Sequence, residues 1–380
     1  MTAQPAKRVD YIDNLRWIMI IAVVGMHAAC SYSAVGGWYW HSATKPDVIS
    51  QLVFIAFQAS LQAFFMGFLF FLAGYFVPTA YDRKGFARFL RDRAFRLGLP
   101  TLFYVFVVHI GMGLFLFDWY GKSGLSPAEG YWRYLTELRW LDGAGPMWFA
   151  AVLLIFCALY AVFRLIARRV PELSANPTAP AFATILGVGV AIGAATFLVR
   201  QVVPVGSFWH GLQFCFFPQY IVLFPLGIVA RRRGWIEALP ARWGKPVLAT
   251  AVIGAPLSIA ALTVLNTGHG SFADIAGGMT TAAAVYAFWE QIFCVLFCVG
   301  LLIVFRDGFN IRNRLIGFLS DNGFAVYVIH PPVLVAITLA MRPLNWPALA
   351  MFALAWTAAL VASFAAGALL RQIPGLRRIL

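Results

Sequence analysis

Charged side chains are scarce in this chain of 380 residues. Asp, Glu, Lys and Arg make up 12% of it, against about 25% in ordinary soluble proteins, whereas 61% of the residues are hydrophobic. Carboxylates are rarest, with 15 Asp and Glu beside 29 Lys and Arg. A soluble core does not absorb so much apolar sequence. Uncharged runs of roughly 18 or more residues recur along the chain, which is the pattern of membrane-spanning helices.

The motifs of several soluble enzyme classes are absent as well. Gly-rich phosphate loops, His-Glu-x-x-His and Gly-x-Ser-x-Gly do not occur, so we expect no bound cofactor. No base-reading motif accompanies the net charge of +14, so we expect no nucleic-acid partner. The cysteines lie inside apolar runs without the spacing of a metal site, so we expect no metal: they are Cys30, Cys157, Cys215, Cys294 and Cys298.

The apolar runs predict an all-α, polytopic integral membrane protein with about ten transmembrane helices. We expect one membrane-embedded domain over residues 1–380, without an appended soluble domain. Proline residues mark many of the joints between the predicted spans: Pro100, Pro146, Pro180, Pro204 and Pro246. The spans are placed at 15–35, 52–79, 98–117, 147–167, 180–199, 208–230, 246–265, 282–305, 323–341 and 347–370.

Basic residues are distributed unevenly between the predicted loops. With a cytoplasmic N-terminus, 23 of the 29 Lys and Arg residues fall on the cytoplasmic side. The other six are Lys45, Lys122, Arg133, Arg139, Arg200 and Arg342. An even number of spans returns the C-terminus to the first side. The positive-inside rule therefore predicts that both termini are cytoplasmic.

The longest polar stretch, residues 119–146, faces outward in this orientation. Ser126-Pro127-Ala128-Glu129 has the pattern of a capping box with proline at the first helical position. Tyr131, Leu135 and Leu138 then fall on one face. The stretch is either a short helix on the outer membrane surface or a structured loop.

Arg16 and His27 are ionisable residues of the first apolar run. They lie eleven residues apart, which at about 100° per residue is three turns plus roughly 20°, so they share a helix face. The rise of about 16 Å places Arg16 at the cytoplasmic edge and His27 near mid-membrane. Asp13, one turn before Arg16, is positioned to orient it. Because ionisable groups are costly in lipid, function is favoured over a histidine merely packed between helices.

A second histidine, His330, is predicted near mid-depth, level with His27. It stands in Tyr327-Val328-Ile329-His330-Pro331-Pro332. The two prolines are predicted to break the helix just beyond it and to leave carbonyl groups that need other partners. His330 is either a site residue or part of the packing around a helix kink.

Further polar residues lie inside the apolar runs. Glu290 is the one carboxylate well within a predicted span, and it belongs either to the site or to a structural ion pair. Gln291, Gln58 and Gln62 are expected to form hydrogen bonds between helices. His109, in the third predicted span, has no partner that the sequence reveals.

A basic segment follows the second predicted span, with six cations within fourteen residues: Arg83, Lys84, Arg88, Arg91, Arg93 and Arg96. This exceeds what orientation requires. The segment either anchors the chain to anionic lipid or docks a polyphosphate donor at the cytoplasmic mouth. In the second interpretation the donor-binding residues are Arg88, Arg91, Arg93 and Arg96.

Four segments together resemble the acyltransferase 3 family of integral membrane acyltransferases. Arg16, ten residues and His27 are similar to its Arg-x10-His motif. FFLAGYF at residues 70–76, the basic segment and Leu99-Pro100 are similar to the end of its second span and the loop that follows. PMWF at residues 146–149 resembles the start of its fourth span, and SDNGFAVYVIHPP at residues 320–332 its Ser…Tyr-x-x-His-x-Pro signature. The length and the loop YWHS at residues 39–42 are most similar to the glucan-modifying branch.

The resemblance implies a multi-pass enzyme of the bacterial inner membrane. It implies transfer of an acetyl or succinyl group from cytoplasmic acyl-CoA to a hydroxyl of an extracytoplasmic glycan or similar acceptor, with a separate extracytoplasmic partner as one route for that acceptor. His27 would act as general base or carry the acyl group. Arg16 would hold a donor phosphate or polarise the thioester carbonyl. His330 and Glu290 are further catalytic candidates, and Asp13, Trp148 and Tyr327 are expected to line the pocket.

Two other functions fit the same features. A transporter or flippase also places polar groups at mid-membrane, but it needs ion-coupling carboxylates, and Glu290 is the one embedded carboxylate. A non-catalytic component of envelope polysaccharide modification would retain its function without His27. Thioester consumption distinguishes the enzyme from the transporter, and intact glycan modification in a His27→Ala strain would favour the non-catalytic component.

Overall fold

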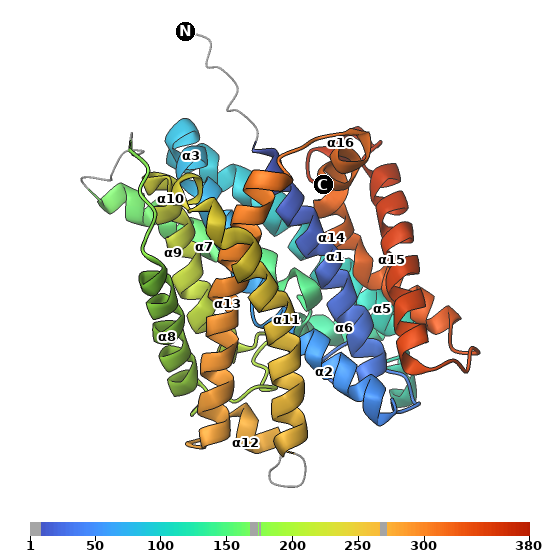
Figure 1. Cartoon of the computed structure of the whole chain (residues 1–380). Helices are drawn as coiled ribbons and strands as arrows, with labels where there is room; N and C mark the ends of the chain where they lie inside the picture. Colours follow the sequence, from blue (N-terminus) through green and yellow to red (C-terminus); the bar gives the residue numbers. More distant parts are fainter. Residues whose placement is uncertain (1–8, 168–173, 175, 267–271) are drawn as a thin grey trace.

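In the computed structural model, residues 9–167, 174, 176–266 and 272–380 are described, and within them the chain forms helices and no β-strand. Figure 1 shows a bundle of long helices with shorter ones at its two ends. The α-helices are α1 (Asp10–Ser33), α2 (Val48–Gln62), α3 (Phe65–Arg93), α4 (Leu99–Phe103), α5 (Ile110–Phe115), α6 (Pro127–Thr136), α7 (Trp148–Ile166), α8 (Phe182–Val199), α9 (Phe217–Arg233), α10 (Trp235–Ala238), α11 (Ala241–Asn266), α12 (Phe272–Ala276), α13 (Thr281–Gly308), α14 (Arg314–Ala340), α15 (Ala348–Leu370) and α16 (Pro374–Arg377).

The long helices confirm the all-α polytopic membrane fold. In the described residues, nine helical stretches are long and apolar enough to cross a membrane. Eight of them coincide with predicted spans. The other, Val48–Phe115, has 68 residues and contains the predicted span 52–79 and all but the last two residues of 98–117. At 1.5 Å per residue it would extend about 100 Å, more than three bilayer cores, and it kinks at Gly85, whose φ is 72°.

Prolines are less disruptive than the sequence suggested. Pro246 lies inside α11 rather than at its start, and Pro100 lies within the continuous helical stretch that ends at Phe115. Pro331 and Pro332 lie inside α14, so the predicted break at these residues is wrong. Membrane helices tolerate proline where neighbouring groups satisfy the carbonyls that it frees.

Small residues allow the closest helix contacts. Gly74 of α3 lies against the backbone of Phe224 in α9, and Gly227 of α9 lies against the backbone of Phe71 in α3. A side chain at either glycine would collide with a carbonyl group of the other helix. Glycines at such crossings let membrane helices approach backbone to backbone, and α3 and α9 hold one wall of the bundle together.

The first span begins and the last span ends at the same face of the bundle. The backbone N–H of Tyr11 donates to Asn310, and Asn14 donates to the carbonyls of Phe309 and Ile311, so α1 begins beside the α13–α14 connection. Figure 1 shows α16 and the start of α1 at this face, near the top of the view. The cytoplasmic location of this face remains a prediction; Lys7, Arg8, Arg168 and Arg169, which contributed to it, lie outside the described residues.

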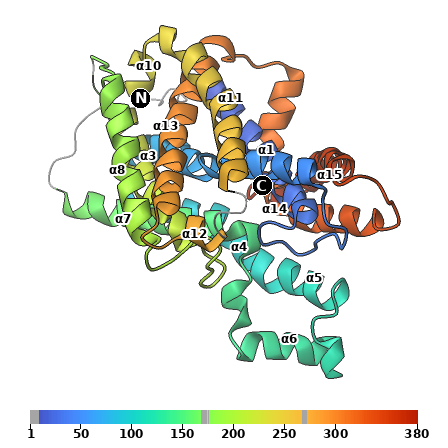
Figure 2. The same ribbon diagram turned by 60° about the horizontal axis from the view of Figure 1, so that its bottom comes forward.

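At the opposite face, α6 packs on α5, and Figure 2 shows this pair standing out from the other helices. The predicted capping box is present: Ser126 accepts from the N–H of Glu129, and the N–H of Ser126 donates to the Glu129 carboxylate at 2.8 Å. Hydrogen bonds from Ser126 lower the pKa of Glu129. The helix ends at Thr136, and Leu138 is exposed with φ 57°, so its predicted place on the apolar face is wrong.

Candidate active site

A cavity of about 1440 Å³ lies along the middle of the bundle and is here called the central cavity. Its wall near the chain ends carries the charged residues Asp13, Arg16, Arg93, Arg96, Asp321, Arg371 and Arg377. Further in, it is lined by His27, Trp148, Phe149 and Tyr327. Toward the opposite face its described lining is uncharged and includes Gly36, Gly37, Val205, Phe208, Gly211, Gln213 and Phe272.

Two histidines from distant parts of the sequence meet beside this cavity. Nδ1 of His27 in α1 lies 3.0 Å from Nε2 of His330 in α14. His27 lines the cavity, whereas His330 is fully buried behind it. The rings are nearly parallel, with centroids 5.2 Å apart. The structure thus joins the two histidines that the sequence placed at equal depth.

The contacts of His330 assign the protons of the pair. Its Nδ1 lies 2.8 Å from the carbonyl oxygen of Tyr327, so this nitrogen carries hydrogen and donates. Nε2 of His330 therefore accepts, and Nδ1 of His27 donates to it. This leaves Nε2 of His27 with a lone pair and without a hydrogen bond among the described residues. A lone pair on a fixed imidazole beside a cavity is the requirement for a general base or nucleophile.

Pro331 explains why the Tyr327 carbonyl is available. In a regular helix this oxygen would accept from the N–H of the residue four positions later, which is Pro331. Proline has no N–H, so the carbonyl loses that donor. His330, next to this proline, supplies a ring N–H in its place. The Tyr-x-x-His-Pro order in the sequence thereby fixes the orientation of His330.

Trp38 packs against one side of the histidine pair. It stacks on His27 with ring centroids 4.2 Å apart and an interplanar angle of 17°. Trp38 belongs to the segment after α1, where Gly36 has φ 92° and a side chain on it would collide with Sγ of Cys30. The turn at this glycine brings the tryptophan back over the end of α1. Stacking from one side and the hydrogen bond to His330 hold the His27 ring in one plane.

Five arginines surround the cavity near the chain ends, here called the basic mouth: Arg16, Arg93, Arg96, Arg371 and Arg377. Arg16 lies 3.3 Å from the carboxylate of Asp13, as predicted, and its guanidinium lies over the ring of Phe76 at 4.4 Å. Arg93 and Arg96 line the cavity, whereas Arg88 and Arg91 are exposed and are not part of its lining. The basic segment therefore contributes two of its four proposed donor-binding residues to the mouth.

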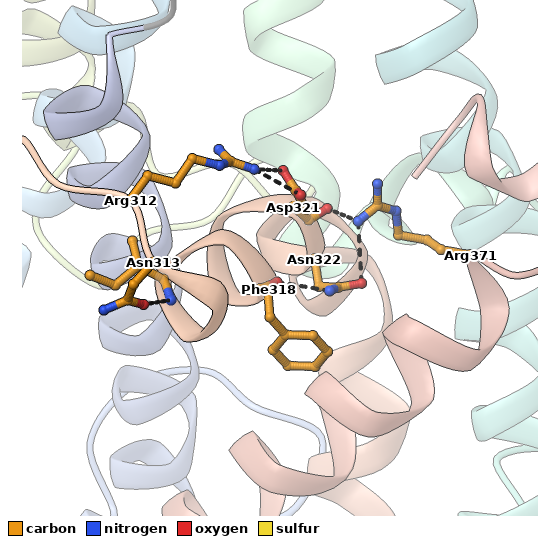
Figure 3. A network of polar contacts seen from close by, with 7 residues as sticks. Arg312, Asn313, Phe318, Asp321, Asn322 and Arg371 are labelled. Atoms are coloured by element: carbon orange, nitrogen blue, oxygen red, sulfur yellow. Dashed lines mark hydrogen bonds and ion pairs between the residues drawn. The ribbon is translucent and has the colours of Figure 1, made fainter.

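The last helices complete the basic mouth (Figure 3). Arg371, just after α15, donates to the backbone carbonyl of Asp321 and lies 3.3 Å from Oδ1 of Asn322 in α14. The carboxylate of Asp321 accepts from Arg312 at 3.0 and 3.1 Å. Figure 3 shows Arg312 and Arg371 approaching Asp321 from opposite sides. These contacts fix the rim of the mouth at the start of α14.

Trp148 and Tyr327 line the same cavity as His27. The hydroxyl of Tyr327 donates to the carbonyl of Pro146 at 2.6 Å, which ties the start of α7 to α14. Trp148, two residues after Pro146, packs against Tyr220 of α9, with ring centroids 5.6 Å apart. Both predicted pocket residues therefore line the cavity, as does Asp13.

Glu290 lies away from the cavity lining, in an ion pair with Arg200. The two charged groups are 2.7 Å apart, and both side chains have no exposed surface. Gln291 donates to the same carboxylate, and Gln219 links Gln291 to the carbonyl of Ala63. The interhelical hydrogen bonds expected of Gln291 are thus present. This placement favours the structural ion pair over a catalytic role for Glu290.

Three contributors to the site escaped the sequence reasoning: Trp38, Arg371 and Arg377. The aromatic run Trp38-Tyr39-Trp40 after two glycines was a usable signal for the first. The two arginines were assigned to orientation alone, because nothing local showed that the end of α15 returns to the mouth. His109, which lacked a partner in the sequence, lies 2.7 Å from the hydroxyl of Tyr39. In the described part of the chain, no three His, Cys, Asp or Glu residues are arranged to hold a metal.

Comparisons with known proteins agree with the four motifs. Residues 9–371 match the acyltransferase 3 family, described as an acyltransferase domain. The chain is 23% identical over 205 residues to "Glucans biosynthesis protein C" of Salmonella heidelberg (strain SL476), covering 53% of this chain and 51% of the relative. It is 25% identical over 160 residues to the protein of that name in Escherichia coli (strain K12), covering 42% and 40%.

The chain spans about half the length of the curated relatives that it matches, and no solved structure matches it. The family match, in contrast, extends over nearly the whole chain and includes the Arg16–His27 segment, the basic segment and the His330 segment. The predicted resemblance is therefore confirmed: this chain belongs to the acyltransferase 3 family of membrane acyltransferases.

Proposed function

We propose that the protein transfers a short acyl group from acyl-CoA, bound at the basic mouth, to a hydroxyl group of a glycan that enters from the opposite face. The observation that carries this proposal is the position of His27. It lines the same cavity as the five arginines, and His330 holds it with one ring nitrogen available. The names of the curated relatives support a glucan as the acceptor.

The basic mouth suits a donor that carries several phosphates. Guanidinium groups bind phosphate oxygens through paired N–H donors, and five of them converge on this part of the wall. Arg16 is the one arginine of α1, the helix that also carries His27, and Asp13 and Phe76 restrict its guanidinium. We assign Arg16 to the phosphate nearest the thioester or to the thioester carbonyl itself, and the other four to the outer phosphates.

In the proposed reaction, Nε2 of His27 accepts the proton of the acceptor hydroxyl while the hydroxyl oxygen attacks the thioester carbonyl carbon. The carbon–sulfur bond breaks, and the thiolate leaves with the electron pair. His27 then returns the proton to sulfur, giving a free thiol and an ester. During the step, the N–H of His27 that faces His330 keeps the imidazole in the required orientation.

The test is acyl transfer by purified protein in lipid nanodiscs, with acetyl-CoA or succinyl-CoA and a glucose oligosaccharide. Thiol release reports donor use, and mass spectrometry reports the acylated sugar. His27→Ala is expected to lower turnover by about 10²–10⁴, the usual contribution of a general base. His41→Ala is the matched control, because His41 is exposed and outside the cavity lining.

Arg16 variants separate donor binding from proton transfer. Arg16→Ala is expected to raise the KM for the donor as well as to slow turnover, and Arg16→Lys to restore only part of both, because an ammonium cannot reproduce the planar fork of arginine. Near-normal turnover in folded His27→Ala would contradict the proposal. An acyl group recovered on His27 after rapid quenching would replace the general-base step with a covalent one. Glycan movement without thiol release would favour a transporter.

A further inference from the structure

A second cavity, of about 890 Å³, lies at the opposite face from the basic mouth and is here called the outer pocket. Among its lining residues are His109, Trp119, Tyr120, Glu137, Asp142 and His210. We infer that the outer pocket binds a sugar ring of a neutral oligosaccharide, one or more units away from the residue that is acylated. This inference rests on the proposed function, since it assigns a site to the acceptor of that reaction.

The outer pocket is continuous in sequence with the wall of the central cavity. The segment before α7 contributes Asp142 to the outer pocket and Pro146 to the central cavity, and Trp148 at the start of α7 also lines the central cavity. The segment before α9 contributes His210 to the outer pocket and Gly211 to the central cavity. Two separate chain segments therefore pass from one cavity to the other, and an extended ligand following them would reach both.

The chemistry of the outer pocket fits a sugar better than an anion. A sugar ring offers C–H groups on one face, which suit an aromatic surface such as Trp119, and hydroxyl groups around its edge, which suit carboxylate acceptors. Glu137 is neutralised by Arg139, with 2.8 Å between the charged groups. The carboxylate of Asp142 remains largely exposed, with His210 3.5 Å away. Unlike the basic mouth, this lining has no excess of arginine with which to attract phosphates.

Unusual backbone geometry gathers around the outer pocket. Tyr104–His109 is a π-helix that ends at a lining residue, and such segments are frequent at functional sites. Tyr134 of α6 donates to the carbonyl of Val105 in this π-helix at 2.9 Å. Leu138 and His210, both in the lining, have φ of 57° and 48°. Strain of this kind persists where surrounding contacts enforce it, and it clusters at binding sites.

A chain of side-chain contacts connects the outer pocket to the histidine pair. The hydroxyl of Tyr39 lies 2.7 Å from Nδ1 of His109 and 2.9 Å from the hydroxyl of Tyr104. The ring of Tyr39 meets Trp38 edge to face, with centroids 5.2 Å apart. Trp38 stacks on His27. A ligand held against His109 would therefore be positioned by residues that also fix the proposed base.

The test measures binding alone, without donor. A glucose oligosaccharide is titrated into the protein in nanodiscs and followed by calorimetry. Trp119→Ala and Asp142→Asn are each expected to weaken binding by about tenfold, the loss typical of removing a central contact of an interface. Trp132→Ala is the matched control, because Trp132 of α6 is 68% exposed and outside the lining. An oligosaccharide of uronic acids should bind more weakly than the neutral one.

The outcomes distinguish this inference from the proposed function. His27→Ala should bind the oligosaccharide as the unmodified protein does, whatever its turnover. Unchanged affinity in Asp142→Asn and Trp119→Ala, or the lack of glucose oligosaccharide binding by the unmodified protein, would overturn the inference. Trp119 packs closely against Gly113; if Trp119→Ala does not fold, Asp142→Asn decides the question, since the Asp142 side chain is largely exposed.

Discussion

Replacing Pro331 with alanine changes the hydrogen bonding of His330 without touching the cavity. The new backbone N–H would point at the carbonyl oxygen of Tyr327, four residues earlier, as in a regular helix. That oxygen now accepts from Nδ1 of His330 at 2.8 Å. The two donors would compete for one acceptor, and the ring of His330 would lose part of its constraint. Because Nδ1 of His27 lies 3.0 Å from Nε2 of His330, the ring of His27 would also lose part of its constraint.

The substitution is expected to have opposite effects on stability and on rate. Alanine is favoured over proline inside a helix by up to about 3 kcal/mol, so Pro331→Ala should unfold at a higher temperature than the unmodified protein. A carbonyl oxygen has two lone pairs, so the ring hydrogen bond is weakened rather than abolished. A net loss of about 1 kcal/mol, the usual worth of one neutral hydrogen bond, corresponds to about fivefold slower turnover, with the KM for the donor unchanged.

The neighbouring proline provides the control. Pro332→Ala also restores a backbone N–H inside α14, but its acceptor, the carbonyl of Val328, makes no hydrogen bond to His330 in the described structure. It should raise stability by a similar amount and leave turnover unchanged. Both variants would be compared by thermal unfolding in detergent and by thiol release in nanodiscs. Equal turnover in the two stabilised variants would refute the role assigned to Pro331.

Three further predictions address the donor, the buried ion pair and the topology. Neutralising Arg93 and Arg96 together should raise the KM for the donor, and the increase should be larger at low salt. Neutralising Arg88 and Arg91 should leave this KM unchanged. Equal effects of the two pairs would favour the interpretation that the basic segment anchors the chain to lipid. Glu290→Ala should lower the unfolding free energy by about 3–5 kcal/mol, because it leaves a buried arginine unpaired; normal stability with lost turnover would make Glu290 catalytic instead. A cysteine introduced at Arg88 should react with an impermeant thiol reagent only from the cytoplasmic side, and labelling from outside would overturn the orientation.

The part of the site that the sequence predicted depends on regular geometry within one helix. Arg16 and His27 share a face because eleven residues make almost a whole number of turns, and α1 is an unbroken helix from Asp10 to Ser33. The estimated depth in the membrane also predicted His330 level with His27, because α1 and α14 begin at the same face of the bundle. Period and depth are properties of a single helix in a bilayer, so no knowledge of packing was needed for these predictions.

The remaining features depend on which helices are neighbours. Arg200 was counted as an outer loop charge, yet it is buried against Glu290 of α13, 90 positions later in the chain. Arg371 and Arg377 reach the cavity because α15 packs along α1 and α14 and returns the chain to the mouth. The start of α9 was placed too early, because Phe208, Trp209 and Leu212 extended the apolar run, yet residues 208–213 form a turn in which His210 has φ 48°. Phe208 and Trp209 are exposed, and hydrophobicity alone does not separate such a turn from a helix.

The distribution of charge along the central cavity bears on the direction of transfer. All arginine and aspartate residues of its described lining lie on the side of His27 that faces the chain ends, and the lining toward the other face is uncharged. A polyphosphate would lose its ionic partners and its water if it moved past His27, which is very unfavourable in an apolar passage. A neutral hydroxyl group meets no such barrier from the other side. With the proposed donor and acceptor, only the acyl group crosses the plane of the histidine pair, so the cavity would permit transfer across the membrane while retaining the carrier.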